Sequence, residues 1–279
     1  MRVLETKNKM IEATPFQLFT HDERLQDYHE EMVVWSREHL KTEALFYAFQ
    51  VKERMETDYL PDACVNLLFS VDRKEVKGYF MGIATQTCKL TFEPDTCYFG
   101  IKPYTNVGLR CFDNDQSCLI DQVYPISEQF AHTENLFSKL YDTQTVHDRK
   151  KLLLASHRDL FLNENQRSVL AEYLSVLLCT ETTAFSMEKI CRETGYSQRY
   201  TQRLFRKEIG ITPKLYSRII RFQNAIKAIY ADNELTLAKV AHQLGYYDQA
   251  HLIHEFQFFT HLSPTRLLQT IVTSKELVV

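Results

Sequence analysis

The chain has 279 residues, of which 44% are hydrophobic and 25% are charged, and it contains only 7 glycines and 7 prolines. This composition predicts a globular protein of about two domains and excludes a disordered or low-complexity chain. The net charge is −3, but Gln166 to the C-terminus carries 14 basic and 10 acidic residues, so only this C-terminal part suits a polyanionic partner.

The first ten residues lack an apolar signal core, and no stretch reaches the about 20 apolar residues that a membrane span requires. The 7 cysteines include no C-x-x-C pair, and their odd number favours free thiols. These features predict a soluble, cytoplasmic protein without membrane contact and without a cofactor.

Residues 45–123 favour a β-rich domain, because short aromatic or β-branched runs alternate there with turn-prone segments. The runs are residues 45–51, 64–71, 76–83, 88–93, 96–101 and 107–112. Evenly spaced short strands are typical of a barrel or a sandwich. The preceding residues 21–39 are predicted to be helical, and the first domain is expected to span residues 1–125.

A helical connector is expected over residues 126–165, where apolar residues recur at helical intervals. These residues are Phe130, Leu136, Phe137, Leu140 and Leu152–Leu154. An exposed amphipathic helix here suits dimerisation, whereas a helix buried along this face caps the N-terminal domain. Both interpretations fit the pattern.

An internal repeat marks the last segment, residues 166–279, which is predicted to be helical throughout. Residues 190–213 align with residues 240–264 when one residue is inserted after a shared Gly-Tyr pair. The matched positions are Gly195-Tyr196 with Gly245-Tyr246, Ser197 with Asp248, Phe205 with Phe256, and Thr212-Pro213 with Ser263-Pro264. Each copy therefore predicts a helix, a tight turn and a second helix.

The turn chemistry of the two copies agrees with this interpretation. Ser186 and Thr236 are expected to cap the first helices, and Ser197 and Asp248 the second ones. The turn glycines supply the left-handed conformation in which a helix often ends. Ser-Pro and Thr-Pro pairs predict the start of the next helix.

The outer face of each second helix carries side chains that suit base edges. Arginine binds guanine and glutamine binds adenine through paired hydrogen bonds, while alanine and isoleucine can contact thymine methyl groups. The predicted base contacts are Gln198, Arg199, Gln202 and Arg203 in the first copy, and Gln249, Ala250, Ile253 and His254 in the second. The predicted phosphate contacts are Ser197, Arg206, Lys214, Arg218, Arg221 and Asp248.

The spacing of the two copies suits double-stranded DNA. Between them, Pro213 to about Ala231 predicts a helix of about 19 residues, roughly 28 Å long. Successive major grooves on one face of DNA lie about 34–36 Å apart. A stiff helix of this length can hold two reading helices at adjacent groove segments.

The motifs G-Y-S-x-R-Y-x-Q-R-x-F and G-Y-x-D-Q-x-H-L, each followed by a Thr-Pro or Ser-Pro pair, resemble the AraC/XylS family of bacterial transcription regulators over residues 166–269. The resemblance implies two helix-turn-helix units that bind two half-sites, and activation more often than repression. It implies base reading by Arg199, Gln202, Arg203, Gln249, Ala250, Ile253 and His254. This chain departs from the family at His254, where arginine is usual, and at His261, where glycine is usual and a left-handed conformation is expected.

The N-terminal segment YLPDACVNLLFSVD, followed by FGIKPY, resembles the cupin-like sensor domains of the same family. The expected fold class is therefore α+β with two domains. A β-rich, cupin-like barrel or sandwich precedes the helical connector and an all-α domain that carries both helix-turn-helix units. The expected partners are promoter DNA and a second copy of the chain, with RNA polymerase and a small-molecule effector as further candidates.

Other functions receive less support from the residues. A metal-dependent enzyme needs clustered ligands, but the chain has no H-x-H or H-E-x-x-H motif, and no enzyme is expected. A cysteine-based redox sensor needs Cys88 and Cys97 on neighbouring strands. A protein adaptor that does not bind DNA is favoured only by the weakly charged face of the second copy. The dense aromatic residues of the N-terminal domain are expected to be mostly core.

Overall fold

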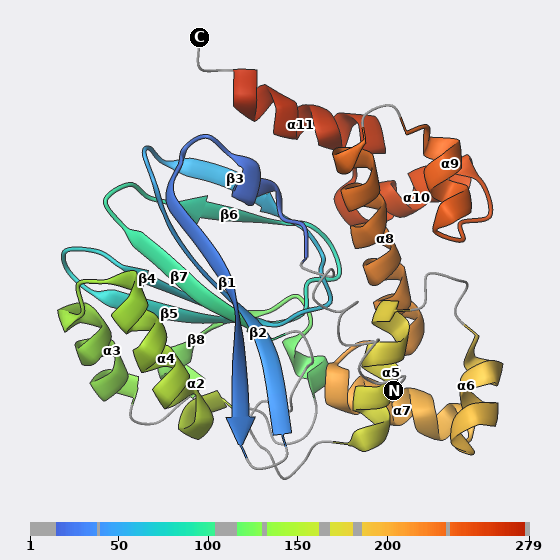
Figure 1. Cartoon of the computed structure of the whole chain (residues 1–279), viewed down its shortest axis with the longest axis horizontal. Helices are drawn as coiled ribbons and strands as arrows, with labels where there is room; N and C mark the ends of the chain where they lie inside the picture. The colour runs from blue at the N-terminus through green and yellow to red at the C-terminus, as the bar shows by residue number, and fades with distance from the viewer. Residues whose placement is uncertain are drawn as a thin grey trace.

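The computed structural model describes residues 15–37, 40–103, 116–129, 133–161, 168–180, 186–232 and 235–276. Figure 1 shows a β-rich N-terminal half beside a helical C-terminal half, with a helical segment covering the outer side of the strands. The predicted run 107–112 lies outside the described residues.

Two antiparallel sheets form the N-terminal half. The larger sheet has six strands in the order β1-β2-β7-β4-β5-β8, and the smaller one pairs β3 with β6. The strands are β1 (Leu25–Arg37), β2 (Leu40–Val51), β3 (Met55–Tyr59), β4 (Asn66–Val71), β5 (Val76–Met81), β6 (Cys88–Phe92), β7 (Cys97–Pro103) and β8 (Val123–Pro125). The β-rich domain is confirmed and its sheets fit a sandwich, while a closed cupin-like barrel stays a prediction.

The helix expected over residues 21–39 is wrong. The structure has a 3-10 turn, η1 (Leu18–His21), followed by the long strand β1. This strand pairs with β2 from Leu25 to Arg37, with a register shift between Gln26 and His29; Met32 lies opposite Leu45 and Val33 opposite Ala44. Cross-strand pairing outweighs the helical preference of the glutamates and glutamine in this segment.

Aromatic side chains fill the interior of the N-terminal domain. Phe46, Phe69, Phe80 and Phe99 are fully buried, and Phe69 stacks on Phe99 with ring centroids 5.5 Å apart. A second cluster packs around Phe49 between the two sheets. Burying one such side chain contributes about 1.5–3 kcal/mol. The expectation that most of the aromatic residues are core is confirmed.

Three helices of the connector pack on the large sheet. They are α2 (Ile126–Gln129), α3 (Thr133–Asp142) and α4 (Val146–Phe161). Leu136, Leu140 and Leu153 are buried in the same apolar cluster as Phe69. The side chain of Lys150 also pairs with Glu31 on β1. The apolar face of the connector therefore covers the sheet, and dimerisation through this segment stays a prediction.

The C-terminal half contains seven described helices. They are α5 (Val169–Thr180), α6 (Met187–Thr194), α7 (Gln198–Ile209), α8 (Pro213–Ala231), α9 (Leu237–Gln243), α10 (Gln249–Thr260) and α11 (Pro264–Glu276). Helix α8 has the predicted 19 residues. Edge-to-face aromatic pairs attach α7 and α10 to it, Phe205 to Tyr216 and Phe256 to Phe222.

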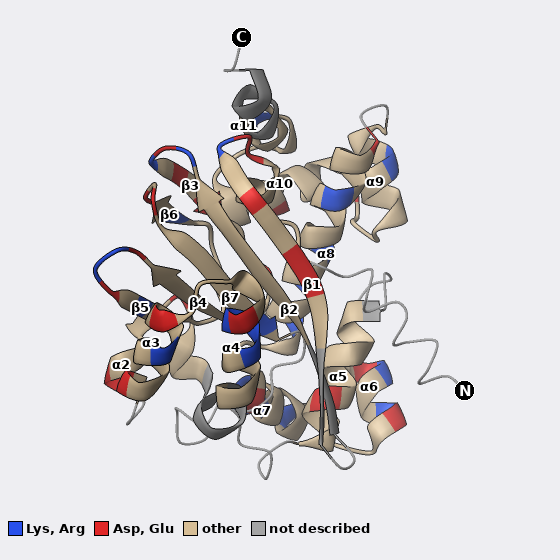
Figure 2. Ribbon diagram, turned by 60° about the vertical axis from the view of Figure 1, so that its left-hand side comes forward, with Lys and Arg blue, Asp and Glu red and all other residues tan. Residues whose placement is uncertain are grey.

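Charge is distributed unevenly over the surface (Figure 2). The edge strand β1 carries acidic residues, including Asp27, Glu30 and Glu31. Unpaired edge strands invite pairing with other chains, and charges of one sign oppose it. Among the described residues, no helix combines the length and apolar character that crossing a bilayer requires, and no group of three or more His, Cys, Asp or Glu could hold a metal ion.

Candidate nucleic-acid interface

The first helix-turn-helix unit is α6, a tight turn and α7. The Ser186 hydroxyl accepts a hydrogen bond from the Lys189 backbone N–H at 3.3 Å, which caps α6. Gly195 ends the helix in the left-handed conformation, with φ of 74°. The Ser197 hydroxyl then accepts from the Tyr200 N–H and begins α7. The predicted caps and the turn glycine of this unit are confirmed.

The second unit, α9 and α10, repeats this plan. Thr236 caps α9, and Gly245 has a φ of 69°. The Asp248 carboxylate accepts from the His251 N–H at 2.7 Å and caps α10. His261 ends α10 in the left-handed conformation with φ of 59°, as predicted from its replacement of glycine.

The predicted base-reading residues lie on the outer faces of α7 and α10. Seven of the eight side chains are exposed and Ile253 is half-buried. These residues are Gln198, Arg199, Gln202 and Arg203 on α7, and Gln249, Ala250, Ile253 and His254 on α10. The opposite faces, including Phe205 and Phe256, are buried against the protein. Both reading faces are therefore open to a ligand.

The six predicted phosphate-contacting residues differ in their surroundings. Arg206 and Lys214 are exposed, at the end of α7 and the start of α8. Ser197 is exposed, but its hydroxyl caps α7. The Asp248 carboxylate likewise caps α10, and its negative charge disfavours a phosphate neighbour.

Arg218 on α8 is bound to α10 instead of facing solvent. Its guanidinium donates to both carboxylate oxygens of Glu255, with Nε distances of 3.0 and 3.1 Å. It also lies over the Phe258 ring, 4.3 Å from the centroid. The Glu255 side chain is only 9% exposed. This bidentate pair mounts the second reading helix on α8.

Arg221, one turn further along α8, is bound to the turn of the second unit. It donates to the Gly245 carbonyl oxygen at 3.1 Å. Its guanidinium lies over the Tyr246 ring at 4.6 Å from the centroid. The arginine thereby satisfies a carbonyl at the end of α9 and fixes the turn that leads into α10.

A buried glutamine joins α8 to the N-terminal domain. Gln223 is 4% exposed, and its Oε1 accepts from the Phe16 N–H at 2.7 Å. Its Nε2 donates to the Pro61 carbonyl at 2.7 Å and to the Phe16 carbonyl at 3.3 Å. The helix between the two reading units is therefore tied to two segments of the β-rich domain.

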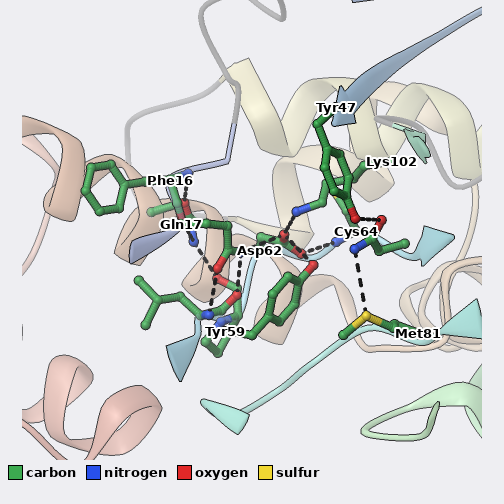
Figure 3. A network of polar contacts seen from close by, with 12 residues as sticks. Phe16, Gln17, Tyr47, Tyr59, Asp62, Cys64, Met81 and Lys102 are labelled. Atoms are coloured by element: carbon green, nitrogen blue, oxygen red, sulfur yellow. Dashed lines mark hydrogen bonds and ion pairs between the residues drawn. The ribbon is translucent and has the colours of Figure 1, made fainter. Parts of the chain in front are cut away.

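The hydrogen bonds continue from this contact into the interior of the β-rich domain (Figure 3). Gln17 donates to the Leu60 carbonyl and to the Asp62 carboxylate. Asp62 also accepts from the Tyr59 hydroxyl at 3.0 Å and from the Lys102 ammonium at 2.5 Å. Both members of the Lys102–Asp62 ion pair are buried, so the network is shielded from water.

Sequence reasoning missed this network, although the P-D-x-C motif that supported the sensor resemblance contains Asp62. The backbone N–H of Cys64 donates to Asp62 at 3.0 Å. Burial raises the pKa of the Cys64 thiol well above its usual value, and burial lowers the pKa of Lys227 on α8 to about 8. The only local sign of this network in the sequence was an aspartate, Asp62, in a turn-like segment between two apolar runs.

The cysteine arrangement differs from the one that a disulfide sensor needs. Cys88 lies on β6 in the two-stranded sheet, while Cys97 lies on β7 in the six-stranded sheet. The suggestion that they occupy neighbouring strands is therefore wrong. Burial raises the pKa of the Cys97 thiol, which favours the protonated and less reactive form.

Comparison with known proteins identifies the fold of the C-terminal half. Residues 190–270 match a family profile described as a helix-turn-helix domain. They form an AraC-type helix-turn-helix domain. The chain is therefore a DNA-binding transcription regulator. The matched residues include all of α7, α8, α9 and α10, and begin within α6.

The solved structures that match this chain are remote in sequence. The C-terminal domain of AraT, a response regulator from Geobacillus stearothermophilus, is 19% identical, with a TM-score of 0.36 over 38% of this chain and 88% of that one. Apo ToxT from Vibrio cholerae is 12% identical, with a TM-score of 0.45 over 82% and 97%. Wild-type ToxT with a bound unsaturated fatty acid is 13% identical, with a TM-score of 0.42 over 84% and 97%. Comparison with curated protein sequences returned no match.

Proposed function

We propose that the chain binds double-stranded promoter DNA at two half-sites through the outer faces of α7 and α10. The observation that supports this most strongly is the pair of exposed reading faces on two like-built units at either end of a 19-residue helix. Guanine is the expected partner of Arg199 and Arg203. Adenine is the expected partner of Gln202 and Gln249.

Phosphate contacts come chiefly from the first unit in this proposal. Arg206 and Lys214 are exposed and are free to approach the DNA backbone. Ser197 lies at the opposite end of α7 from Arg206, at the helix N-terminus, where backbone N–H groups can also bind a phosphate. Arg218, Arg221 and Asp248 are not retained as phosphate contacts, because their side chains are bound within the second unit.

The N-terminal domain receives the regulatory signal in this proposal. Asp62 binds Lys102 and Gln17, and the neighbouring backbone groups of Pro61 and Phe16 bind Gln223, so these buried contacts connect the interior of the domain to α8. A small-molecule effector that alters this network would change how the two reading units are held. Activation of transcription, contact with RNA polymerase and a homodimer in the cytoplasm complete the proposal, which includes no enzymatic activity.

The test uses the full chain and DNA selected from a random library. Arg203→Ala should weaken binding to the selected fragment by about 1–3 kcal/mol. For the parent chain, the logarithm of the binding constant should fall steeply and linearly with the logarithm of the salt concentration, because phosphate contacts release counterions. Arg54→Ala, which changes an exposed arginine of the N-terminal domain, is the control and should leave affinity unchanged.

Two results would contradict the proposal. The first is that no DNA is retained at any salt concentration, as expected of a protein adaptor. The second is equal affinity of Arg203→Ala and the parent chain for the selected fragment.

A further inference from the structure

An exposed tyrosine stands at the entrance to the second reading helix. Tyr247 is 91% exposed, whereas the adjacent Tyr246 is 5% exposed. Tyr247 is the residue by which the second copy of the repeat exceeds the first. It directly precedes Asp248, the cap of α10, and so lies beside the exposed residues Gln249 and Ala250.

The backbone of Tyr247 is held firmly although its side chain projects into solvent. Its N–H donates to the His251 Nδ1 at 3.2 Å, and the His251 N–H donates to the Asp248 carboxylate. On the other side, Tyr246 is fixed beneath Arg221. Binding a partner therefore restricts the side-chain rotamers of Tyr247 but need not order its backbone.

The charge of the second unit indicates what this tyrosine contacts. Helix α10 contains no lysine or arginine, whereas α7 contains Arg199, Arg203, Arg206 and Lys207. The nearest arginines on α8, Arg218 and Arg221, are bound internally. Two exposed cations, Lys239 on α9 and Arg266 on α11, lie outside α10 and the turn before it. An uncharged donor at the start of α10 is therefore favoured as the partner of a phosphate there, and tyrosine hydroxyls are regular phosphate partners.

We propose that Tyr247 is a DNA-backbone contact of the second unit, with its hydroxyl donating to a phosphate at the edge of the second half-site and its ring lying on the adjoining sugar. This inference rests on the proposed function. It gives the second unit a contact with the DNA backbone that needs no charged side chain. The N-terminal end of a reading helix lies closest to the groove, which places the residue before the cap at the groove edge.

The test measures the binding of the full chain to the selected fragment. Tyr247→Ala should weaken binding about 5–10-fold, and Tyr247→Phe about 2–4-fold, because the phenylalanine keeps the ring but not the donor. Neither variant should change the slope of affinity against salt, because a neutral hydroxyl releases no counterion. Tyr141→Ala, at an exposed tyrosine of α3, is the matched control and should leave affinity unchanged.

Phosphate ethylation interference locates the contact. Ethylation of one phosphate beside the second half-site should hinder the parent chain but not Tyr247→Phe. The inference is overturned if parent and variants share one interference pattern, or if Tyr247→Ala acts only by lowering the midpoint of thermal unfolding. If the parent chain selects no DNA, the proposed function itself fails. If Arg203→Ala weakens binding while both Tyr247 variants bind like the parent, only this inference fails.

Discussion

The two helix-turn-helix units share one backbone plan but hold it with different side chains. In the first unit, Tyr196 after the turn glycine is exposed and stacks on Tyr200, with ring centroids 5.1 Å apart. Its counterpart in the second unit, Tyr246, is buried under Arg221. The tyrosine of the shared Gly-Tyr pair therefore faces solvent in one unit and the protein interior in the other.

The difference arises from helix α8. Its Arg218 and Arg221 reach only the second unit, where they bind Glu255 and the Gly245 carbonyl. The cations of the first unit, such as Arg203 and Arg206, stay exposed. The arginines of the first unit are thus available for DNA, whereas Arg218 and Arg221 of α8 serve the assembly of the second unit, in which Lys239 on α9 remains exposed. A repeated motif fixes the backbone of a unit, but not how its charges are used.

The largest expected effect comes from removing the carboxylate that mounts the second unit. Glu255→Ala leaves the Arg218 guanidinium without its bidentate partner, while only 25% of that side chain is exposed. A partly desolvated and unpaired charge should lower the free energy of unfolding by about 2–4 kcal/mol. Urea unfolding of the full chain measures the loss.

The first unit supplies the control for this prediction. Glu188 pairs with Arg192 across one turn of α6 at 3.2 Å, and both side chains are largely exposed. Glu188→Ala should therefore cost less than about 0.5 kcal/mol. Equal losses for Glu188→Ala and Glu255→Ala would mean that the two units do not differ in how they use charge.

A smaller loss of stability is expected when the contact between α8 and the N-terminal domain is removed. It tests whether α8 alone determines the arrangement of the two units. Gln223→Leu keeps the size of the side chain but leaves the Phe16 N–H and the Phe16 and Pro61 carbonyls without this partner. The unfolding free energy should fall by about 1–3 kcal/mol. Hydrogen exchange of the Phe16 amide should become faster.

Asn224, a half-buried neighbour on the same helix, provides the matched substitution. Asn224→Leu should change stability by less than Gln223→Leu and should leave the Phe16 amide protected. If the two variants have the same unfolding free energy and the same exchange rate at the Phe16 amide, Gln223 does not hold α8 to the N-terminal domain. The difference between the two units then depends on α8 alone.

The features that were predictable from sequence are those that neighbouring residues determine. The caps at Ser197 and Asp248, the turn at Gly195 and the length of α8 follow from side chains within a few positions of the backbone they serve. The outer faces of α7 and α10 follow from helical periodicity once the opposite face is apolar.

The missed features depend on partners far away in the chain. Strand β1 forms because β2 pairs with it, and no local pattern reports that pairing. The partner of Arg218 lies 37 residues away, and the Phe16 partner of Gln223 lies 207 residues away. Helical spacing placed Arg218 and Arg221 on one helix, but it could not show that they face the second unit instead of DNA.

The smallest expected effect concerns the left-handed residues at which the reading units turn. A Cβ added to Gly195 meets no atom within 4 Å, so Gly195→Ala tests the backbone cost alone and should lower stability by about 1 kcal/mol. His261→Gly reverses the substitution at the end of α10, where His261 is exposed and has a φ of 59°. Relief of that cost, partly offset by the greater freedom of glycine in the unfolded chain, should raise stability by about 0.5 kcal/mol. Thermal unfolding of both variants and of the parent chain measures whether each substitution raises or lowers stability. If Gly195→Ala lowers stability and His261→Gly raises it, the same backbone preference acts at both turns, and the two units differ only in their side chains. If His261→Gly lowers stability, the imidazole of His261 stabilises the second unit by more than its left-handed backbone costs.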